Sequence, residues 1–411
     1  MGTRLLLGVD IGTQSAKGVL VTLDGRIVAA ARHAHRPAQP RPGHFEQDAD
    51  DVWWRSFLEV CRRLFTDDEL DPHAVAAVGV SGIGPCLVPT DADGRPLRPA
   101  ILYGIDTRAT AETAWLTEQY GEQAGRVSAA AADQTGLPVG TPVSAGTGDA
   151  AAEAFGVGVR RPGDLMITYG STTVLLQVVS ELPLHTPLWG MAYVKPGEAA
   201  VVGGMATSGL VARWLRDLVG GTGVDHAELS RAAAAVPAGS RGLVALPYFA
   251  GERTPLHDPQ ARGMIAGLSL AHGRAELYRA ILEGTAFGIR HNIEAMVDHG
   301  MAPRRVVAVG GGTEDDLWPQ ITSAVTGLPQ HVAHPGVAAA YGDTILAGLA
   351  AGVVDPGVDG WHRPVRTIEP AADDADIYRR LYPVYRRLYE ATVEQLHVLA
   401  GAQEETRPSP R

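Results

Sequence analysis

The chain contains 411 residues, of which 45% are hydrophobic and 20% are charged; this composition is ordinary for a soluble globular protein long enough to form two domains. A formal net charge of −11 without a basic run argues against nucleic acids and anionic membranes as partners. No apolar run approaches the ~18 residues of a membrane span, and we expect no secretory signal. The only cysteines, Cys61 and Cys86, suit neither a disulfide framework nor a metal site, so we expect a cytoplasmic protein.

Residues 5–21 (LLLGVDIGTQSAKGVLV) predict a strand–turn–strand hairpin, because two runs of apolar, β-favouring residues flank a glycine-containing turn. Asp10 ends the first strand. Closely spaced backbone N–H groups follow it in Gly12, Thr13 and Gln14. Glycine lets such donors approach an anion, and a carboxylate beside a polyphosphate requires a cation between them, usually Mg²⁺. The hairpin therefore predicts a magnesium–nucleotide site, although an Asp before a glycine turn is equally typical of a structural Asx-turn.

The following residues predict the element order of a ribonuclease-H-like domain. After the hairpin we expect a strand, a helix, a strand, an extended segment and a helix at residues 26–32, 52–65, 74–81, 96–105 and 107–120. A last strand and a glycine turn lead to Asp149, and a helix begins at residue 150. This first domain ends near residue 161, and Pro162-Gly163 marks the boundary.

The second domain begins with a repeat of the first hairpin. DLMITYGSTTVLLQVV, residues 164–179, aligns with residues 5–21 when Gly170 is laid on Gly12. Internal repeats indicate duplicated architecture, and two such hairpins facing each other across a cleft would hold a phosphate chain from both sides. The repeat is asymmetric, because Thr168 stands in the position of Asp10.

The remaining elements are expected in the order glycine loop, helix, long loop, long helix, strand with a triple glycine that leads into a helix, and two further helices. They lie at residues 203–209, up to 219, 246–263, 274–298, 305–318, 338–351 and 377–399. We place the second domain at residues 162–400. The polar tail 401–411 is expected to be disordered.

Several of these segments together resemble the FGGY family of carbohydrate kinases, within the actin/hexokinase/Hsp70-like superfamily. The most specific are GMIAGLSLAHGRAELYRAILEG, residues 263–284, and VGGGTEDDLWPQITSAVTGLP, residues 309–329, which resembles the family's adenosine-binding stretch. AGTGDAAAEAFG resembles the segment with the family's catalytic aspartate, and GVSG together with DADGRPLRPAILYGIDTR resembles its sugar-side segment. The resemblance implies an α/β fold of two ribonuclease-H-like (actin-like ATPase) domains with a nucleotide cleft between them.

The resemblance also implies roles for individual residues. Asp149 matches the general base that takes the proton of the attacking sugar hydroxyl, and Asp10 would hold the Mg²⁺ shell. ATP would contact Gly12, Thr13 and Gln14 in one domain and Gly170, Ser171 and Thr172 in the other, with its adenosine against Gly310, Gly311 and Gly312. Asp106, Arg108, Ile83 and Asp149 would face the sugar or polyol substrate. A homodimer is compatible with the family.

Structural alternatives stand beside these roles. Asp149 could act only as the N-cap of its helix, and Asp106 and Arg108 could be a helix cap and a surface charge. Lys17 could contact phosphate, but a solvated lysine on a strand is an equally good interpretation.

The chain departs from the family pattern at two places. Ile83-Gly84-Pro85 replaces a polar or His-containing stretch that touches the sugar in many relatives. The sugar specificity of a particular relative therefore cannot be assigned to this chain. Several dozen residues that usually precede the catalytic strand are missing, with a seam near residues 123–125. Because that part normally builds the sugar-side wall, we predict retained nucleotide binding and weak or absent sugar turnover.

Two functions from different classes follow. The leading one is ATP-dependent phosphorylation of a hydroxyl of a small sugar (a ketopentose) or polyol, and the alternative is a catalytically impaired nucleotide- or sugar-binding remnant of such a kinase. Asp10 and Asp149 favour the enzyme, whereas the seam favours the remnant. A dinucleotide-binding oxidoreductase is not supported, because G-G-G-T-E-D at residue 310 is not G-x-G-x-x-G.

Overall fold

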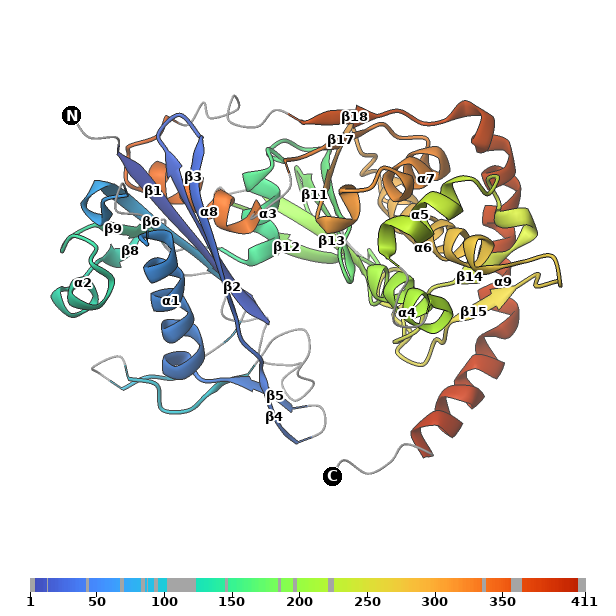
Figure 1. Cartoon of the computed structure of the whole chain (residues 1–411), viewed down its shortest axis with the longest axis horizontal. Helices are drawn as coiled ribbons and strands as arrows, with labels where there is room; N and C mark the ends of the chain where they lie inside the picture. Colours follow the sequence, from blue (N-terminus) through green and yellow to red (C-terminus); the bar gives the residue numbers. More distant parts are fainter. Residues whose placement is uncertain are drawn as a thin grey trace. The chain divides into compact units, whose positions relative to one another are not determined.

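The computed structural model describes residues 4–12, 14–41, 44–66, 70–82, 86, 88–91, 95–101, 123–144, 147–183, 186–194, 198–220, 225–334, 338–355 and 364–405. The chain forms two compact units (Figure 1): Met1–Gly158 with Val337–His362, and Val159–Gly336 with Arg363–Arg411. Each unit contains a β-sheet packed against helices, so the expected α/β class is confirmed. No helix in the described part of the chain is both long and apolar enough to span a membrane.

The first unit is built on a six-stranded sheet in the order β3-β2-β1-β6-β9-β8. β1 pairs antiparallel with β2 and parallel with β6, and β6 pairs parallel with β9. The first five strands thus have the order expected for a ribonuclease-H-like sheet. The strands are β1 (Leu5–Ile11), β2 (Ser15–Thr22), β3 (Ile27–Ala34), β6 (Val75–Gly82), β8 (Gln123–Arg126) and β9 (Pro142–Ser144). A small separate sheet joins β4 (Ala38–Arg41), β5 (His44–Gln47) and β7 (Ala100–Ile101).

Helices cover both faces of this sheet. α1 (Arg55–Leu64) and α2 (Ala129–Thr135) contribute to the core on one face, whereas α3 (Asp149–Gly156) and α8 (Ala338–Ala350) pack together against the strands on the other. Side chains alternate between the faces of a strand, so Val9 joins the α1 core and Asp10 points to the α3/α8 face. The predicted helix at 52–65 begins as a π-helical turn, Ala49–Trp54, and Asp48 accepts hydrogen bonds from its first N–H groups.

Glycines allow α8 to lie unusually close to the sheet. A Cβ atom on Gly8 would be 1.8 Å from the carbonyl oxygen of Ala340, and one on Gly79 would be 1.9 Å from the carbonyl oxygen of Asp343. No other residue fits such an approach. The sequence prediction assigned this helix to the second domain, but it completes the first unit.

The second unit repeats the same architecture on a seven-stranded sheet in the order β12-β13-β11-β10-β16-β17-β18. β10 pairs antiparallel with β11 and parallel with β16, just as β1 pairs with β2 and β6. The predicted repeat is therefore a duplication of the fold. The strands are β10 (Asp164–Thr168), β11 (Thr173–Val179), β12 (Trp189–Ala192), β13 (Ala199–Met205), β16 (Arg305–Val309), β17 (Gln330–Val332) and β18 (Arg366–Ile368), with β14 (Val244–Leu246) and β15 (Met264–Ala266) in a separate pair.

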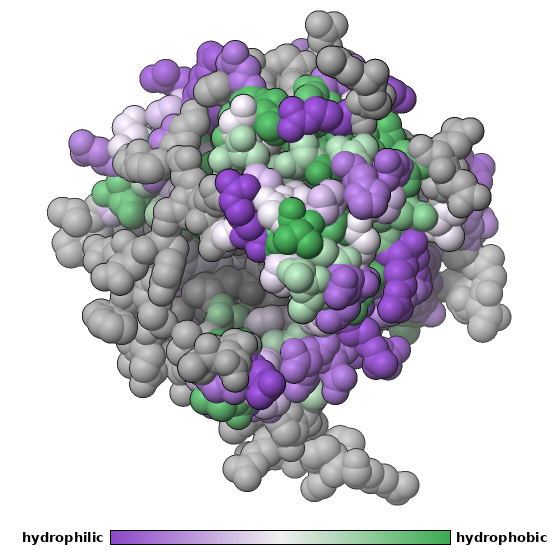
Figure 2. Space-filling view, turned by 90° about the vertical axis from the view of Figure 1, so that its left-hand side faces the viewer, coloured by the Kyte–Doolittle hydropathy of each residue, from purple (hydrophilic) through white to green (hydrophobic). Residues whose placement is uncertain are grey.

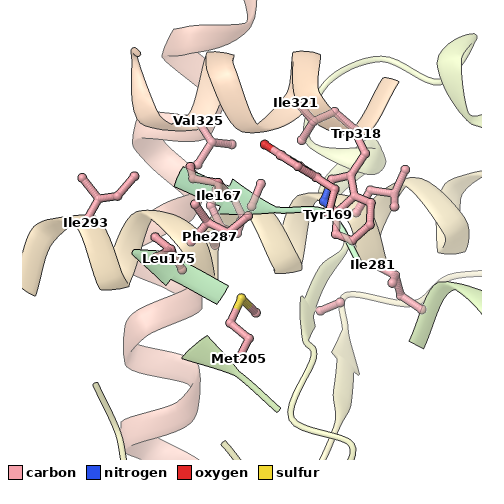
Figure 3. Close-up of a cluster of buried hydrophobic side chains, with 14 of the residues drawn as sticks. Ile167, Tyr169, Leu175, Met205, Ile281, Phe287, Ile293, Trp318, Ile321 and Val325 are labelled. Atoms are coloured by element: carbon pink, nitrogen blue, oxygen red, sulfur yellow. The ribbon is translucent and has the colours of Figure 1, made fainter. Parts of the chain in front are cut away.

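A helical layer packs against this second sheet. Figure 3 shows Phe287 of the long central helix beside Ile167 and Leu175 of the strands, and Ile281 of the same helix belongs to the same continuous buried cluster. The helices are α4 (Gly209–Gly220), α5 (His226–Ala234), α6 (Arg274–Asp298), α7 (Leu317–Thr326) and α9 (Ala372–Glu405). α6 has the predicted bounds. α9 is longer than predicted and continues through Glu405, so the disorder expected from residue 401 is wrong for its first five residues; residues 406–411 and the predicted helix 107–120 lie outside the described part.

Candidate active site

A group of carboxylates lies on the α3/α8 face of the first unit, where β1 and β6 end. Asp10, near the end of β1, is only 5% exposed. Its Oδ2 atom is 3.9 Å from Nζ of Lys17 on the neighbouring strand, and its Oδ1 atom is 3.4 Å from Oγ of Ser81 near the end of β6. The two oxygens of Asp10 therefore have different surroundings, one beside a cation and one beside a hydroxyl group.

Asp343 of α8 extends this group into the protein interior. Its side chain is fully buried, and a hydrogen bond of 2.6 Å joins its Oδ2 atom to Ser81 Oγ. The close packing of α8 on Gly79 brings it there. Asp343 was not identified from the sequence, although a single acid within the apolar stretch AAAYGDTILAGLA was a detectable signal.

Asp149 is the first residue of α3, and Gly148 occupies the N-cap position. The Asp149 Oδ1 atom accepts a hydrogen bond of 2.7 Å from the N–H of Ala150. Asp149 is therefore not the N-cap residue itself, although its carboxylate accepts a hydrogen bond at the start of the helix. Its side chain remains exposed, which leaves the carboxylate accessible to a ligand at a helix N-terminus, where negative charge is favoured.

The electrostatics of this group are dominated by burial. Loss of water around the carboxylates raises the pKa of Asp10 to about 6 and the pKa of Glu153 to about 7, partly offset by Lys17. Partial loss of water raises the pKa of Asp149, and complete burial raises the pKa of Asp343 most strongly. Glu153 lies four residues after Asp149, on the same face of α3, and was also not identified from the sequence.

This group of carboxylates fits a cation whose other ligands are water and the phosphates of a bound nucleotide. Among the described residues, no three His, Cys, Asp or Glu side chains are arranged as a metal site. Mg²⁺ is commonly bound through one or two carboxylates, with water and substrate phosphates completing its shell. One accessible oxygen of Asp10 would meet that requirement, whereas a metal held by protein ligands alone would not be expected here.

In the turn of the first hairpin, some backbone groups of the described residues already form hydrogen bonds with other backbone groups of the protein. The N–H of Gly12 donates to the carbonyl of Ser15 at 3.1 Å, and the carbonyl of Gln14 accepts from the N–H of His35 at 2.9 Å. Gln14 is exposed, and its side chain stays available for a ligand. Thr13, Ile83, Asp106 and Arg108 lie outside the described residues, so their predicted roles remain predictions.

The corresponding turn of the second unit, between β10 and β11, has a polar character. Thr168, in the place of Asp10, accepts the N–H of Val174 at 2.8 Å through its hydroxyl oxygen. The carbonyls of Gly170 and Ser171 accept hydrogen bonds from Gly209 and Ser208 at the start of α4. Within the described structure the N–H groups of Gly170 and Ser171 have no acceptor, so they are free to bind an anion; Thr172 is partly exposed beside them.

The triple glycine lies next to this turn, because β16 is the neighbour of β10. The N–H of Gly312 donates to the carbonyl of Tyr169 at 2.8 Å, and the N–H of Tyr169 donates to the carbonyl of Val309 at 2.7 Å. Gly310 has a φ of +96°, whereas a Cβ atom on Gly311 would meet nothing within 4 Å. The structure thus brings the two predicted nucleotide segments of the second unit together at the carboxyl ends of parallel strands, where ligands bind in open α/β sheets.

A cavity lies on the opposite face of the first sheet from the carboxylates. It has a volume of about 410 Å³ and is lined mainly by apolar side chains of the sheet, of α1 and the turn before it, and of β8 and α2, among them Val80, Trp53 and Ala131. β8 starts at the predicted seam, so this cavity borders the place where the chain is predicted to lack a segment. Apolar side chains are also exposed, in separate patches among hydrophilic ones, on the face shown in Figure 2.

Two family models match the chain. The N-terminal domain of the FGGY family of carbohydrate kinases matches residues 5–124, and the C-terminal domain of the same family matches residues 165–351. The first match ends within the predicted seam at residues 123–125. Together these matches cover most of the chain and confirm the resemblance proposed from its motifs.

Similar individual proteins are named as sugar kinases. The chain is 23% identical to a xylulose kinase of Staphylococcus epidermidis over an alignment of 493 residues, which covers 95% of the chain and 98% of the relative. It is 29% identical to a ribulokinase of Bacillus licheniformis over 300 residues, covering 68% of the chain and 54% of the relative. The crystal structure of xylulose kinase from Rhodospirillum rubrum superposes with a TM-score of 0.84 at 28% identity, covering 96% of the chain and 100% of that structure.

Proposed function

Because the chain belongs to the FGGY family of carbohydrate kinases, we propose that it transfers the γ-phosphate of Mg-ATP to a hydroxyl group of a ketopentose or a polyol. The observation that carries this proposal is the pair of carboxylates in the first unit. Asp10 is buried beside a lysine, whereas Asp149 is exposed at the start of a helix. Two acids in such different environments suit two different roles, one toward a cation and one toward a proton.

Asp149 is the residue proposed as general base. Phosphoryl transfer needs a residue that orients the acceptor hydroxyl and accepts its proton. The raised pKa of Asp149 makes its carboxylate a stronger base, which is favourable as long as it stays ionised at the working pH. Ile83, Asp106 and Arg108 are proposed to face the sugar beside it, in a sugar-side domain spanning residues 1–161.

Asp10 is proposed to hold the Mg²⁺ that accompanies ATP. When bound, the ion neutralises charge on the transferring phosphate. Lys17, 3.9 Å from Asp10, adds a positive charge at the same place. Gly12, Thr13 and Gln14 complete this side of the phosphate site.

The second unit is proposed to bind the nucleotide. The unpaired N–H groups of Gly170 and Ser171, with Thr172, suit phosphate oxygens. The open space at Gly311 lets an adenosine lie against the backbone of Gly310 to Gly312. This nucleotide-side domain is proposed to span residues 162–400 apart from residues 337–362, which belong to the first unit.

An active enzyme is favoured over an impaired remnant. The similarity to xylulose kinase extends over nearly the whole chain, and the surroundings of both carboxylates support the roles proposed for them. The missing sugar-side segment remains the reason to expect low turnover. We also propose a cytoplasmic location, consistent with the two cysteines of the sequence, and a homodimer as one assembly to test.

The test is release of ADP from Mg-ATP in the presence of a panel of ketoses and polyols. We expect ADP release that depends on one class of sugar, and a 10²–10⁴-fold loss of that rate in Asp149→Ala, the range for removal of a general base. Asp133→Ala, which changes an exposed acid of α2, is the matched control and should retain the full rate. Sugar-independent ADP release, or release that survives in Asp149→Ala, would contradict the proposal; nucleotide binding without any turnover would favour the remnant.

A further inference from the structure

The hydroxyl group of Ser81 lies between two carboxyl groups that come from distant parts of the chain. Its Oγ atom is 2.6 Å from Oδ2 of Asp343 and 3.4 Å from Oδ1 of Asp10. All three side chains are at least nine-tenths buried, with exposed fractions of 3% for Ser81, 0% for Asp343 and 5% for Asp10. The other oxygen of Asp343, Oδ1, has no hydrogen-bond partner among the described residues.

A count of protons shows how hydrogen bonds can link Asp343, Ser81 and Asp10. Ser81 has one hydroxyl proton and cannot donate it to both carboxyl groups. If Asp343 carries a proton, it donates to Ser81 Oγ, and the hydroxyl proton of Ser81 is then directed at Asp10. Complete burial of Asp343 favours its neutral form by raising its pKa.

The position of Asp343 is fixed by backbone packing and not by its own side chain alone. A Cβ atom on Gly79, two residues before Ser81, would collide with the Asp343 carbonyl oxygen at 1.9 Å, and one on Gly342 would collide with the Ala152 carbonyl oxygen of α3 at 1.9 Å. Two glycines thus hold α8 close to β6 and to α3. Such close packing suits Asp343 if it has to keep the side chain of Ser81 in place.

We propose that Asp343 and Ser81 are positioning residues for Asp10: they hold its Oδ1 atom from the interior of the first unit, so that Oδ2 faces Lys17 and the cation that accompanies ATP. The inference rests on the proposed Mg-ATP chemistry and extends it to two residues that do not touch the nucleotide. Second-layer partners of this kind usually change metal affinity or activity by 10–100-fold when they are removed.

The experiment compares Ser81→Ala, Asp343→Ala and Asp343→Asn in the full-length protein. The Asp343→Asn substitution keeps the size of the side chain and supplies an N–H donor for Ser81, whereas Asp343→Ala removes the donor. Thr344→Val is the matched control, because Thr344 is equally buried on α8 and its hydroxyl donates only to the helix carbonyl of Tyr341. Each variant is measured for Mn²⁺ binding in the presence of a non-hydrolysable ATP analogue by electron paramagnetic resonance, for the Mg²⁺ concentration that gives half-maximal ADP release, and for thermal unfolding.

We expect Ser81→Ala and Asp343→Ala to weaken Mn²⁺ binding and to raise the half-maximal Mg²⁺ concentration by about 10–100-fold. Asp343→Asn should stay within about threefold of the unchanged protein, and Thr344→Val should lower thermal stability without changing metal dependence. The inference is overturned if Ser81→Ala binds Mn²⁺ normally, if Asp343→Asn is as impaired as Asp343→Ala, or if Thr344→Val produces the same loss. If the unchanged protein does not bind the Mn²⁺–nucleotide complex at all, the proposed function is overturned together with this inference. Mn²⁺ binding by the unchanged protein distinguishes this case from failure of the inference alone.

Discussion

The two sheets of the molecule have the same strand order around their central strands, but their carboxyl ends differ in chemistry. In the first unit the end of β1 carries Asp10, and three further acids lie around it on α3 and α8. In the second unit the equivalent position is Thr168, and the surrounding groups are glycines and backbone N–H donors. A duplicated scaffold thus has a charged end, which suits a cation, and a neutral end rich in backbone donors, which suits an anion.

Exchanging the equivalent residues should have the largest effect. Asp10→Thr gives the first unit the residue of the second, and we expect metal-dependent ADP release to fall by about 10²-fold or more, as for loss of one group that stabilises transition-state charge. Thermal unfolding should not shift downward, because the substitution removes a buried charge. The reciprocal Thr168→Asp should instead raise the KM for ATP through repulsion of the phosphates; metal dependence that is unaltered in Asp10→Thr would remove the proposed distinction between the units.

Two neighbouring glycines of the second unit allow the effect of backbone conformation to be tested separately from the space that a ligand would occupy. Gly310→Ala places a side chain at a φ of +96° and 2.8 Å from the carbonyl oxygen of Tyr169, and should cost about 1–3 kcal/mol of stability. Gly311→Ala points into open space and should leave the melting temperature unchanged, but weaken ATP binding by about tenfold because the methyl group displaces the ligand. Calorimetric titration with ATP and thermal unfolding of both variants test this; equal ATP affinity in Gly311→Ala and the unchanged protein would argue against an adenosine site there.

The carboxylates should make the stability of the first unit depend on pH. The pKa values of Asp10 and Glu153 are raised to about 6 and about 7, so between about pH 4 and pH 7 the folded chain binds more protons than the unfolded chain. Stability therefore falls as pH rises through that window, and we expect a melting temperature about 2–5 °C lower at pH 8 than at pH 5. Glu153→Gln should reduce this difference, measured by thermal unfolding at both pH values, while Asp133→Asn should not; an unchanged difference in Glu153→Gln would show that other groups cause it.

The smallest effect is expected at the cavity of the first unit, which contrasts with the filled core around Phe287 in the second. Ala131 lines this cavity of about 410 Å³, and Ala131→Leu should raise the melting temperature by about 1–3 °C by burying additional apolar surface. Ala130→Leu, on the exposed side of α2, serves as the control. A loss of stability in Ala131→Leu would mean that the cavity cannot accept the larger side chain.

The sequence was most informative where structure is local. The hairpins at Asp10 and Gly170 were predicted because alternating apolar residues and glycine turns lie within a few positions of each other, and α6 was predicted with its correct bounds. Asp343 was missed because its partner Ser81 is 262 residues away, and no local pattern encodes such a contact. The placement of α8 in the first unit was missed for the same reason, since it depends on glycines in two distant strands.

The route of the chain through the two units constrains how it can be made. The chain crosses between them three times, at residues 158, 336 and 362, so each unit needs a segment that is synthesised after most of the other. At about 5–20 residues per second, about 15 to 55 s pass between the synthesis of Gly79 and that of the last residue of α8, Ala350. During that interval the face with Asp10 and Ser81 lacks its main covering helix, and transiently exposed apolar surface of this kind favours aggregation.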